Sequence, residues 1–250
     1  MQVKPYKDQQ GTKKEQVAQM FNSIAPRYDF LNHFLSMGID KIWRKKAISK
    51  LKDRNITYLL DIATGTGDFA ITASKIKDII ITGIDISDQM LAVGREKLNK
   101  LNLQDRVNFL TGDSENIEFP DNSFEAITVA FGVRNFENLN KGLSEMYRVL
   151  KPEGLAVILE FSKPKAFPVK QLYNFYFKFI LPLLGKLVSK DNSAYTYLPE
   201  SVSQFPDGNN FIVELEKAGF TKCTSKSLTF GIATIYTGEK QNNVSAFSKQ

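Results

Sequence analysis

The segment 59–68, LLDIATGTGD, constrains this chain most, because apolar residues lead directly into two glycines spaced by one residue. Such a pattern predicts a buried strand, a tight turn and the N-terminus of a helix. Gly65 and Gly67 would let the backbone adopt positive φ angles and approach a ligand closely. A second apolar run, 78–85, ends at Asp85, an acid 20 residues after Gly65. An acid at this spacing can bind ribose hydroxyls, so we predict a site for a nucleoside-containing cofactor.

Two classes of cofactor fit this pattern, a dinucleotide and S-adenosylmethionine. A dinucleotide site is typical of G-x-G-x-x-G, but Ala70 occupies the third glycine position here. Asp61 lies inside the first predicted strand, where a carboxylate suits the cationic amino group of S-adenosylmethionine better than a pyrophosphate. Asp113 follows a third apolar run, 106–111, and could accept a hydrogen bond from the adenine amine. These acids favour S-adenosylmethionine over a sheet in which acids only cap helices.

Apolar strands alternate with helical segments through the middle of the chain, which predicts an α/β fold with a parallel sheet. The expected strands are 57–63, 79–85, 106–111, 124–131 and 154–161, and the expected helices are 68–76, 88–101 and 138–149. A further helix at about 207–218 and two strands near 220–228 and 231–238 are expected to complete the sheet.

Before the sheet, we expect helices at about 13–24 and 30–52, broken near Pro26. Asp40 is placed to cap the second half of the longer helix. Residues 1–12 are predicted to be disordered.

The region after Pro164 has a different pattern. Residues 167–188 are rich in aromatic and apolar side chains, but Lys178, Pro182 and Lys186 interrupt them. A transmembrane helix needs about 20 mostly apolar residues, so this stretch is too short and too interrupted to span a membrane. It is either a lid over a hydrophobic substrate or a helix buried against the core.

The basic charge is concentrated in residues 1–54, which hold 12 Lys and Arg against 5 Asp and Glu. Lys41 and Lys45 belong to an amphipathic basic helix. Such a face can simply be solvated, can contact an anionic membrane surface, or can bind nucleic acid. No recognised nucleic-acid-binding motif accompanies it, so no nucleic-acid partner is expected.

The chain has one cysteine, Cys223, and one histidine, His33. A single cysteine excludes an intramolecular disulfide, and the two residues cannot build a Cys/His metal cluster, so no metal is expected. Residues 1–16 are polar and charged and lack a signal-peptide pattern, so a cytoplasmic location is expected.

Four more segments, at 17–29, 131–135, 159–162 and 197–201, read VAQMFNSIAPRYD, FGVRN, LEFS and YLPES. With the glycine run, they resemble the ubiquinone/menaquinone biosynthesis C-methyltransferase family, and the similarity runs from about Val17 to Gly238. The resemblance implies a Rossmann-like class I methyltransferase fold: a mostly parallel seven-stranded sheet with helices on both faces, an N-terminal helical cap and a lid insertion after strand five. The expected division is a tail and basic cap at 1–54 and a methyltransferase domain at 55–250, with lid helices at about 165–205.

The resemblance also implies an activity, the S-adenosylmethionine-dependent methylation of a ring carbon of a polyprenyl quinol. Conversion of demethylmenaquinol to menaquinol is preferred. One alternative is methylation of the methoxy-polyprenyl-benzoquinol in ubiquinone biosynthesis, alone or together with the menaquinone step. Another is methylation of a different small lipid-like acceptor. A cofactor-binding scaffold without activity and an NAD-dependent oxidoreductase also stay open. Because the implied substrate lies in the membrane, we expect transient contact with the inner face of the cell membrane, and a homodimer is a further open arrangement.

The family's cofactor contacts transfer to this sequence by residue. Thr64 in the glycine loop would hold the carboxylate end of the methionine, Asp85 the ribose, and Asp113 with Ser114 the adenine. Family members often carry a serine just before the FGVRN segment, whereas this chain has Ala130, which puts a side-chain contact there in doubt.

Methylation of a quinol carbon needs a base, or a cation that lowers the pKa of the neighbouring phenol. Arg134 cannot act as a base, but it can stabilise a phenolate, and Asn135 could hold the other oxygen. The alternative is that the pair only fixes a buried loop. Tyr28 could close over the methionine end of the cofactor, and His33 is either the base or a structural residue. Tyr195 and Tyr197 are weaker candidates for the substrate mouth.

Overall fold

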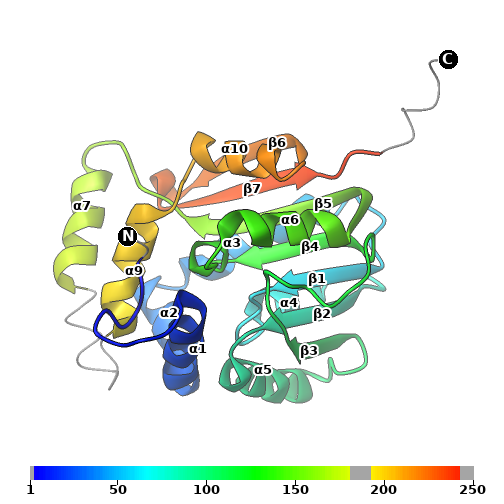
Figure 1. Ribbon diagram of the computed structural model, residues 1–250, viewed down its shortest axis with the longest axis horizontal. Coiled ribbons are helices and arrows are strands. Elements are labelled where there is room, and N and C mark those ends of the chain that lie inside the picture. The colour runs from blue at the N-terminus through cyan, green and yellow to red at the C-terminus, as the bar shows by residue number, and fades with distance from the viewer. Residues whose placement is uncertain (1–2, 181–192, 243–250) are drawn as a thin grey trace.

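The computed structural model describes residues 3–180 and 193–242 of the chain. Its centre is a seven-stranded sheet in the order β3-β2-β1-β4-β5-β7-β6 (Figure 1). The strands are β1 Tyr58–Ile62, β2 Ile80–Asp85, β3 Val107–Thr111, β4 Phe124–Ala130, β5 Leu150–Phe161, β6 Thr221–Leu228 and β7 Ala233–Glu239. The first five strands pair in parallel, and β7 is antiparallel to both β5 and β6. The mostly parallel seven-stranded sheet predicted from the sequence is therefore confirmed.

Helices cover both faces of this sheet, because its central strands are apolar on both sides. One face packs against Trp43, Phe69 and Leu91, which belong to α3, α4 and α5. The other face packs against Leu143 of α6 and Phe211 of α10. The helices are α3 Ile39–Ile48, α4 Asp68–Ala73, α5 Asp88–Leu101, α6 Leu139–Val149 and α10 Asn209–Lys217, with short 3₁₀ turns η2 Ser49–Leu51 and η5 Thr229–Gly231.

The N-terminal helices differ in part from the expectation. The helix α1, Lys13–Ile24, is confirmed, and the turn η1, Ala25–Arg27, follows it. The expected continuous helix over 30–52 is wrong: the chain forms α2, Tyr28–Leu35, and then α3. The chain turns between them because Met37 and Gly38 both have positive φ angles, of 51° and 74°, which an α-helix does not accept.

Two further expectations about this region are corrected. Asp40 does not cap α3, whose N-cap is Gly38 and has no side-chain hydrogen bond. Its carboxylate instead accepts a hydrogen bond from Ser36 and pairs with Arg44. Residues 3–12 were expected to be disordered, but Val3 and Tyr6 pack on the buried cluster of Val17, Met20 and Tyr197.

The segment after β5 forms α7, Val169–Phe175, a π-helical turn η4, Tyr176–Ile180, and, after residues 181–192, α9, Ser193–Gln204. Figure 1 shows α1, α2 and α9 at the end of the sheet to which the parallel strands point. The last third of the predicted apolar stretch, 181–188, lies outside the described residues. Within the described ranges, no helix is both long and apolar enough to cross a membrane.

Candidate active site

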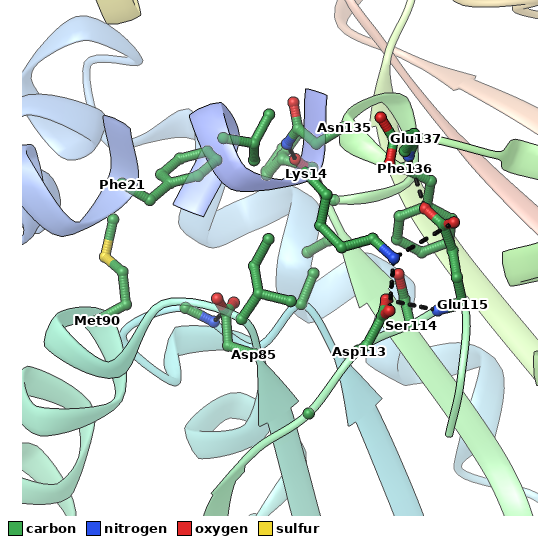
Figure 2. A pocket seen from close by; sticks show the side chains of 18 of the residues that line it. Lys14, Phe21, Asp85, Met90, Asp113, Ser114, Glu115, Asn135, Phe136 and Glu137 are labelled. Atoms are coloured by element: carbon green, nitrogen blue, oxygen red, sulfur yellow. Dashed lines mark hydrogen bonds and ion pairs between the residues drawn. The ribbon is translucent and has the colours of Figure 1, made fainter. Parts of the chain in front are cut away.

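A pocket lies at the carboxyl ends of β1, β2, β3 and β4, where ligands of open α/β sheets bind. Its floor includes Asp85 and Asp113, and its opposite wall includes Phe21 of α1 (Figure 2). Gly65 and Val17 also line the pocket. The pocket is therefore built between the sheet and the N-terminal helices. This geometry explains why the strand-end residues were predictable from the sequence, whereas the α1 wall was not.

The glycine loop connects β1 to α4. Gly65 and Gly67 have positive φ angles of 56° and 81°, as the sequence predicts. A side chain on Gly67 would meet the ring of Phe109, because a Cβ built there lies 2.3 Å from its Cζ atom. Gly65 lines the pocket and Gly67 does not. Gly67 is thus required by the packing of the loop on the sheet.

Asp85 lies at the end of β2 with its carboxylate beside the pocket. The amide of Gly65 donates to Oδ2 at 2.8 Å, and the amide of Ser87 donates to Oδ1 at 2.8 Å. Burial raises the pKa of Asp85 to about 6, despite these two donors. An ionised acceptor held in this way can bind a pair of ribose hydroxyls, and that contact of Asp85 stays a prediction.

Asp61 is buried beneath the glycine loop and does not line the pocket. Its Oδ2 accepts from the hydroxyl of Thr64 at 2.6 Å, and its Oδ1 accepts from the hydroxyl of Thr128 at 2.6 Å. Burial raises the pKa of Asp61 to about 6. Asp61 and Thr64 thus join the loop to β4 in this structure, and their contacts to a cofactor stay predictions.

Asp113 and Ser114 both line the pocket, after β3. The Nζ atom of Lys14, on α1, lies 2.6 Å from Oδ2 of Asp113 and 3.6 Å from Oε2 of Glu115 (Figure 2). The predicted adenine acceptor therefore already carries an ion pair to the opposite wall. Sequence reasoning missed Lys14, although Lys14, Val17 and Phe21 have the i, i+3, i+7 spacing of one helix face.

Asn135 and Ala130 line the pocket, but Arg134 does not. Arg134 belongs to the turn η3, Val133–Asn135, and its guanidinium lies 2.8 Å from the fully buried carboxylate of Glu160. It also donates to the carbonyl of Phe131 and lies over the ring of Phe161. These contacts fix the η3 turn, so a role for Arg134 in the chemistry stays a prediction.

Lys13 attaches α1 to the same turn. Its Nζ atom donates to the carbonyl oxygens of Arg134 at 3.0 Å and Phe136 at 2.7 Å. Burial lowers the pKa of this amine to about 8. The two neighbouring lysines of α1, Lys13 and Lys14, therefore fix the helix to η3 and to the β3 loop respectively.

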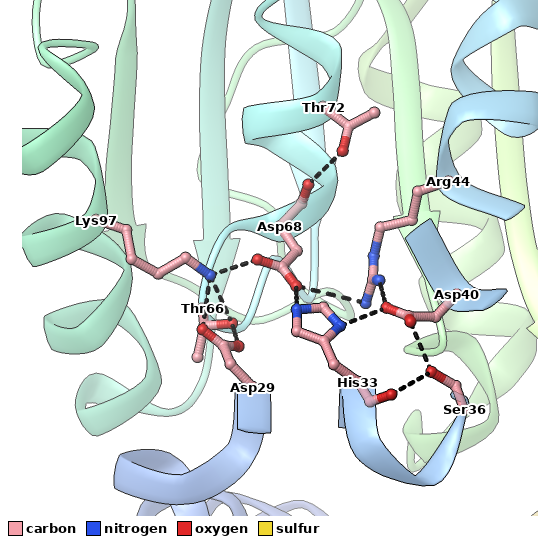
Figure 3. A network of polar contacts seen from close by, with 9 residues as sticks. All are labelled: Asp29, His33, Ser36, Asp40, Arg44, Thr66, Asp68, Thr72 and Lys97. Atoms are coloured by element: carbon pink, nitrogen blue, oxygen red, sulfur yellow. Dashed lines mark hydrogen bonds and ion pairs between the residues drawn. The ribbon is translucent and has the colours of Figure 1, made fainter. Parts of the chain in front are cut away.

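Tyr28 lines the pocket, and its contact with the methionine end of the cofactor stays a prediction. His33 lies outside the pocket, in a polar network that joins α2 and α3 to α4 (Figure 3). His33 Nδ1 is 2.9 Å from Asp40, and its Nε2 is 3.4 Å from Asp68. Both ring nitrogens therefore face carboxylates, which supports the structural role for His33. These three residues have the chemistry of metal ligands, but Asp68 and Asp40 already contact the cations of Lys97 and Arg44.

The family model described as the ubiE/COQ5 methyltransferase family matches residues 9–240. The chain belongs to this family. It is 52% identical to a demethylmenaquinone methyltransferase of Bacteroides fragilis over 95% of this chain and 97% of that protein. It is 49% identical to a ubiquinone/menaquinone biosynthesis C-methyltransferase of Geotalea daltonii, over 91% of this chain and 97% of that protein.

Solved structures agree with the fold. A SAM-dependent methyltransferase of Thermotoga maritima superposes with a TM-score of 0.64 at 17% identity, covering 89% of this chain and 99% of that one. At this identity the likeness supports the class I methyltransferase fold alone. Within the ubiE/COQ5 family, this chain is a methyltransferase that takes its methyl group from S-adenosylmethionine.

The raised pKa of Asp85 predicts pH-dependent cofactor binding. Only the ionised carboxylate can accept from both ribose hydroxyls, so binding should weaken as the pH falls below about 6. We expect the Kd of S-adenosylhomocysteine to rise about tenfold from pH 7 to pH 5 through this group. Isothermal titration calorimetry across this range measures it.

Asp85→Asn should bind more weakly at pH 7 and lose this tenfold, and any remaining pH dependence then reports Asp61. Asp88→Asn is the matched control, because Asp88 is an exposed acid on the next helix and does not line the pocket. A variant at position 85 that keeps the full pH dependence would contradict the ribose assignment.

Proposed function

We propose that this protein methylates a ring carbon of demethylmenaquinol to give menaquinol. The observation that carries the proposal is the 52% identity, over 95% of the chain, to a protein named demethylmenaquinone methyltransferase. The pocket supports it, because an acid for the ribose and a polar η3 turn lie at the same strand ends. A sulfonium methyl donor needs alignment and an activated acceptor, and we propose that no metal takes part.

The residues around the pocket have distinct parts in this reaction. Asp85, Asp113 and Ser114 hold the nucleoside, and Asp61 with Thr64 shapes the loop at the methionine end. Asn135 and Tyr28 both line the pocket. Asn135 holds an oxygen of the acceptor ring, and Tyr28 closes over the methionine end of the cofactor. The acceptor's phenol loses its proton, which makes the neighbouring ring carbon nucleophilic enough for the transfer.

The surface supports a location at the cytoplasmic face of a membrane. The rings of Phe30 and Phe34 stack at 5.8 Å between centroids and are exposed, and Met37 is 82% exposed. Lys41 and Lys45 are exposed on α3, directly after this apolar turn. Apolar side chains with adjacent lysines fit an anionic lipid surface, which would bring the enzyme to a lipid-soluble substrate.

A second acceptor has a specific observation in its favour. The Geotalea daltonii relative, 49% identical, is named for both ubiquinone and menaquinone biosynthesis. The methoxy-polyprenyl-benzoquinol precursor of ubiquinone is therefore the second candidate substrate.

A methyl-transfer assay tests both candidates. Radiolabelled S-adenosylmethionine is incubated with reduced demethylmenaquinone or with the methoxy-benzoquinol, and the labelled product is identified. We expect label in menaquinol and its loss in Asp85→Ala, which removes the proposed ribose acceptor. Label in both products would assign both steps. Label in neither, from protein that still binds S-adenosylhomocysteine, would refute a quinol substrate.

A further inference from the structure

Among the residues that the structure describes, several buried polar atoms near the η3 turn lack a hydrogen-bond partner. They are Arg134 Nε, Asn135 Oδ1, Tyr173 Oη and Tyr197 Oη. Leaving one such atom unsatisfied in a folded protein costs about 1–3 kcal/mol, so native structures hold few of them. Four together, with both donors and acceptors among them, indicate a place where a polar group of a ligand is bound.

These atoms come from three elements. Arg134 and Asn135 lie on η3, Tyr197 lies on α9, which contacts η3, and Tyr173 lies on α7. Both tyrosine side chains lie within electrostatic reach of the Arg134 guanidinium and of Glu160. Asn135 also lines the cofactor pocket, so the cluster adjoins the position of the methyl donor.

The chemistry of this cluster suits an oxygen that becomes negatively charged. Burial raises the pKa of both phenols well above their usual range, so they remain neutral hydrogen-bond donors at any assay pH. The guanidinium of Arg134 does not lose its proton. Donors of this kind can stabilise a developing oxyanion, and an amide oxygen such as Asn135 Oδ1 can accept from the hydroxyl before it ionises.

We propose that Tyr173 and Tyr197, with Arg134 Nε, form a subsite that binds the acceptor's ring oxygen next to the methylated carbon. This inference rests on the proposed function. In the reaction, the phenol proton passes to solvent, and the electron pair of the phenolate forms the carbon–methyl bond. The methyl–sulfur bond breaks and leaves its pair on sulfur. The ring carbon then loses its hydrogen as a proton to solvent, and the phenolate oxygen so regenerated takes up a proton from solvent to give the quinol.

Tyr173→Phe and Tyr197→Phe test the subsite. Each removes a buried hydroxyl without a protein partner, so the melting temperature should not fall and the Kd of S-adenosylhomocysteine should be unchanged. We expect kcat/KM for demethylmenaquinol to fall about 10- to 100-fold, the usual range for a hydrogen bond to a charged group. The pH at which kcat is half-maximal should move upward, because kcat reports ionisation in the bound complex and the bound phenol ionises less readily without its donor.

Tyr236→Phe is the matched control, because the Tyr236 hydroxyl accepts from the amide of Gly208 at 2.7 Å on a different part of the sheet. This variant should have a lower melting temperature, and its kcat/KM and the pH profile of its kcat should be unchanged.

The inference would be overturned if the two subsite variants had a lower melting temperature but unchanged kcat/KM and an unchanged pH profile of kcat. Their hydroxyls would then be structural. That result would leave the proposed function standing, because the wild type would still methylate the quinol. Absence of quinol methylation by the wild type itself would overturn both.

Discussion

Arg134→Met is expected to lower the free energy of unfolding by about 3–5 kcal/mol, the usual cost of leaving one partner of a buried ion pair uncompensated. Glu160 is 0% exposed, and its carboxylate depends on the guanidinium 2.8 Å away. Burial already raises the pKa of Glu160, so without Arg134 the ionised form would be harder still to keep. Urea unfolding at pH 7 measures the loss.

The double variant Arg134→Met/Glu160→Gln separates folding from chemistry. It removes both charges, so we expect it to recover most of the lost stability. If methyl transfer stays at least about 100-fold below the wild type, the guanidinium acts on the acceptor. Recovery of activity together with stability would make Arg134 a loop-fixing residue only. A single variant that loses less than about 1 kcal/mol would contradict the importance of the pair.

Asp61→Asn is expected to have the opposite effect on stability, raising it by about 1–3 kcal/mol at pH 7 in the absence of cofactor. The pKa of Asp61 is about 6 in the fold against an ordinary value of 3.8, so ionisation at pH 7 opposes folding. Asparagine keeps an acceptor for one hydroxyl and donates to the other. If Asp61 reaches the ligand's ammonium, as predicted from the sequence, the same change should also weaken binding of S-adenosylhomocysteine by about 100-fold.

The sign of this effect can be followed with pH. The gain in the free energy of unfolding of Asp61→Asn over the wild type should be complete above about pH 6. It should vanish below about pH 4, where the native Asp61 is also protonated. Thermal unfolding across this range and calorimetric titration at pH 7 measure the two effects. Thr128→Val is the control, because it removes a donor to Asp61 and should only destabilise the fold. If Asp61→Asn were less stable than the wild type and bound S-adenosylhomocysteine with normal affinity, the Asp61 carboxylate would have a structural role only.

Much of the sheet and of the cofactor floor was predictable because it depends on local patterns. Apolar runs ending at Asp85 and Asp113 place both acids at strand ends, and strand ends of a parallel sheet meet at one edge. The break at Met37 and Gly38 was missed because both flanking segments are amphipathic, so the pattern continues across the turn.

Contacts between distant segments were not predictable in this way. Lys14 and Asp113 are 99 residues apart, and nothing local to either residue shows that α1 covers the β3 loop. Arg134 was identified from a sequence motif, but the motif does not reveal that its charge faces Glu160, which lies on the next strand. The unpartnered hydroxyls of Tyr173 and Tyr197 are likewise a property of three elements packed together.

The position of α1 over the pocket has a kinetic consequence. One wall of the pocket is a helix that Lys13 fixes to η3 and Lys14 fixes to Asp113. If spent and fresh methyl donor exchange through this side, the helix must lift, and detachment of the two neighbouring lysines is then a step of the catalytic cycle. Where that step is slower than methyl transfer, it sets the turnover rate. Because Lys14 and Asp113 are both partly exposed, added salt weakens their pair and shortens the residence time of the product.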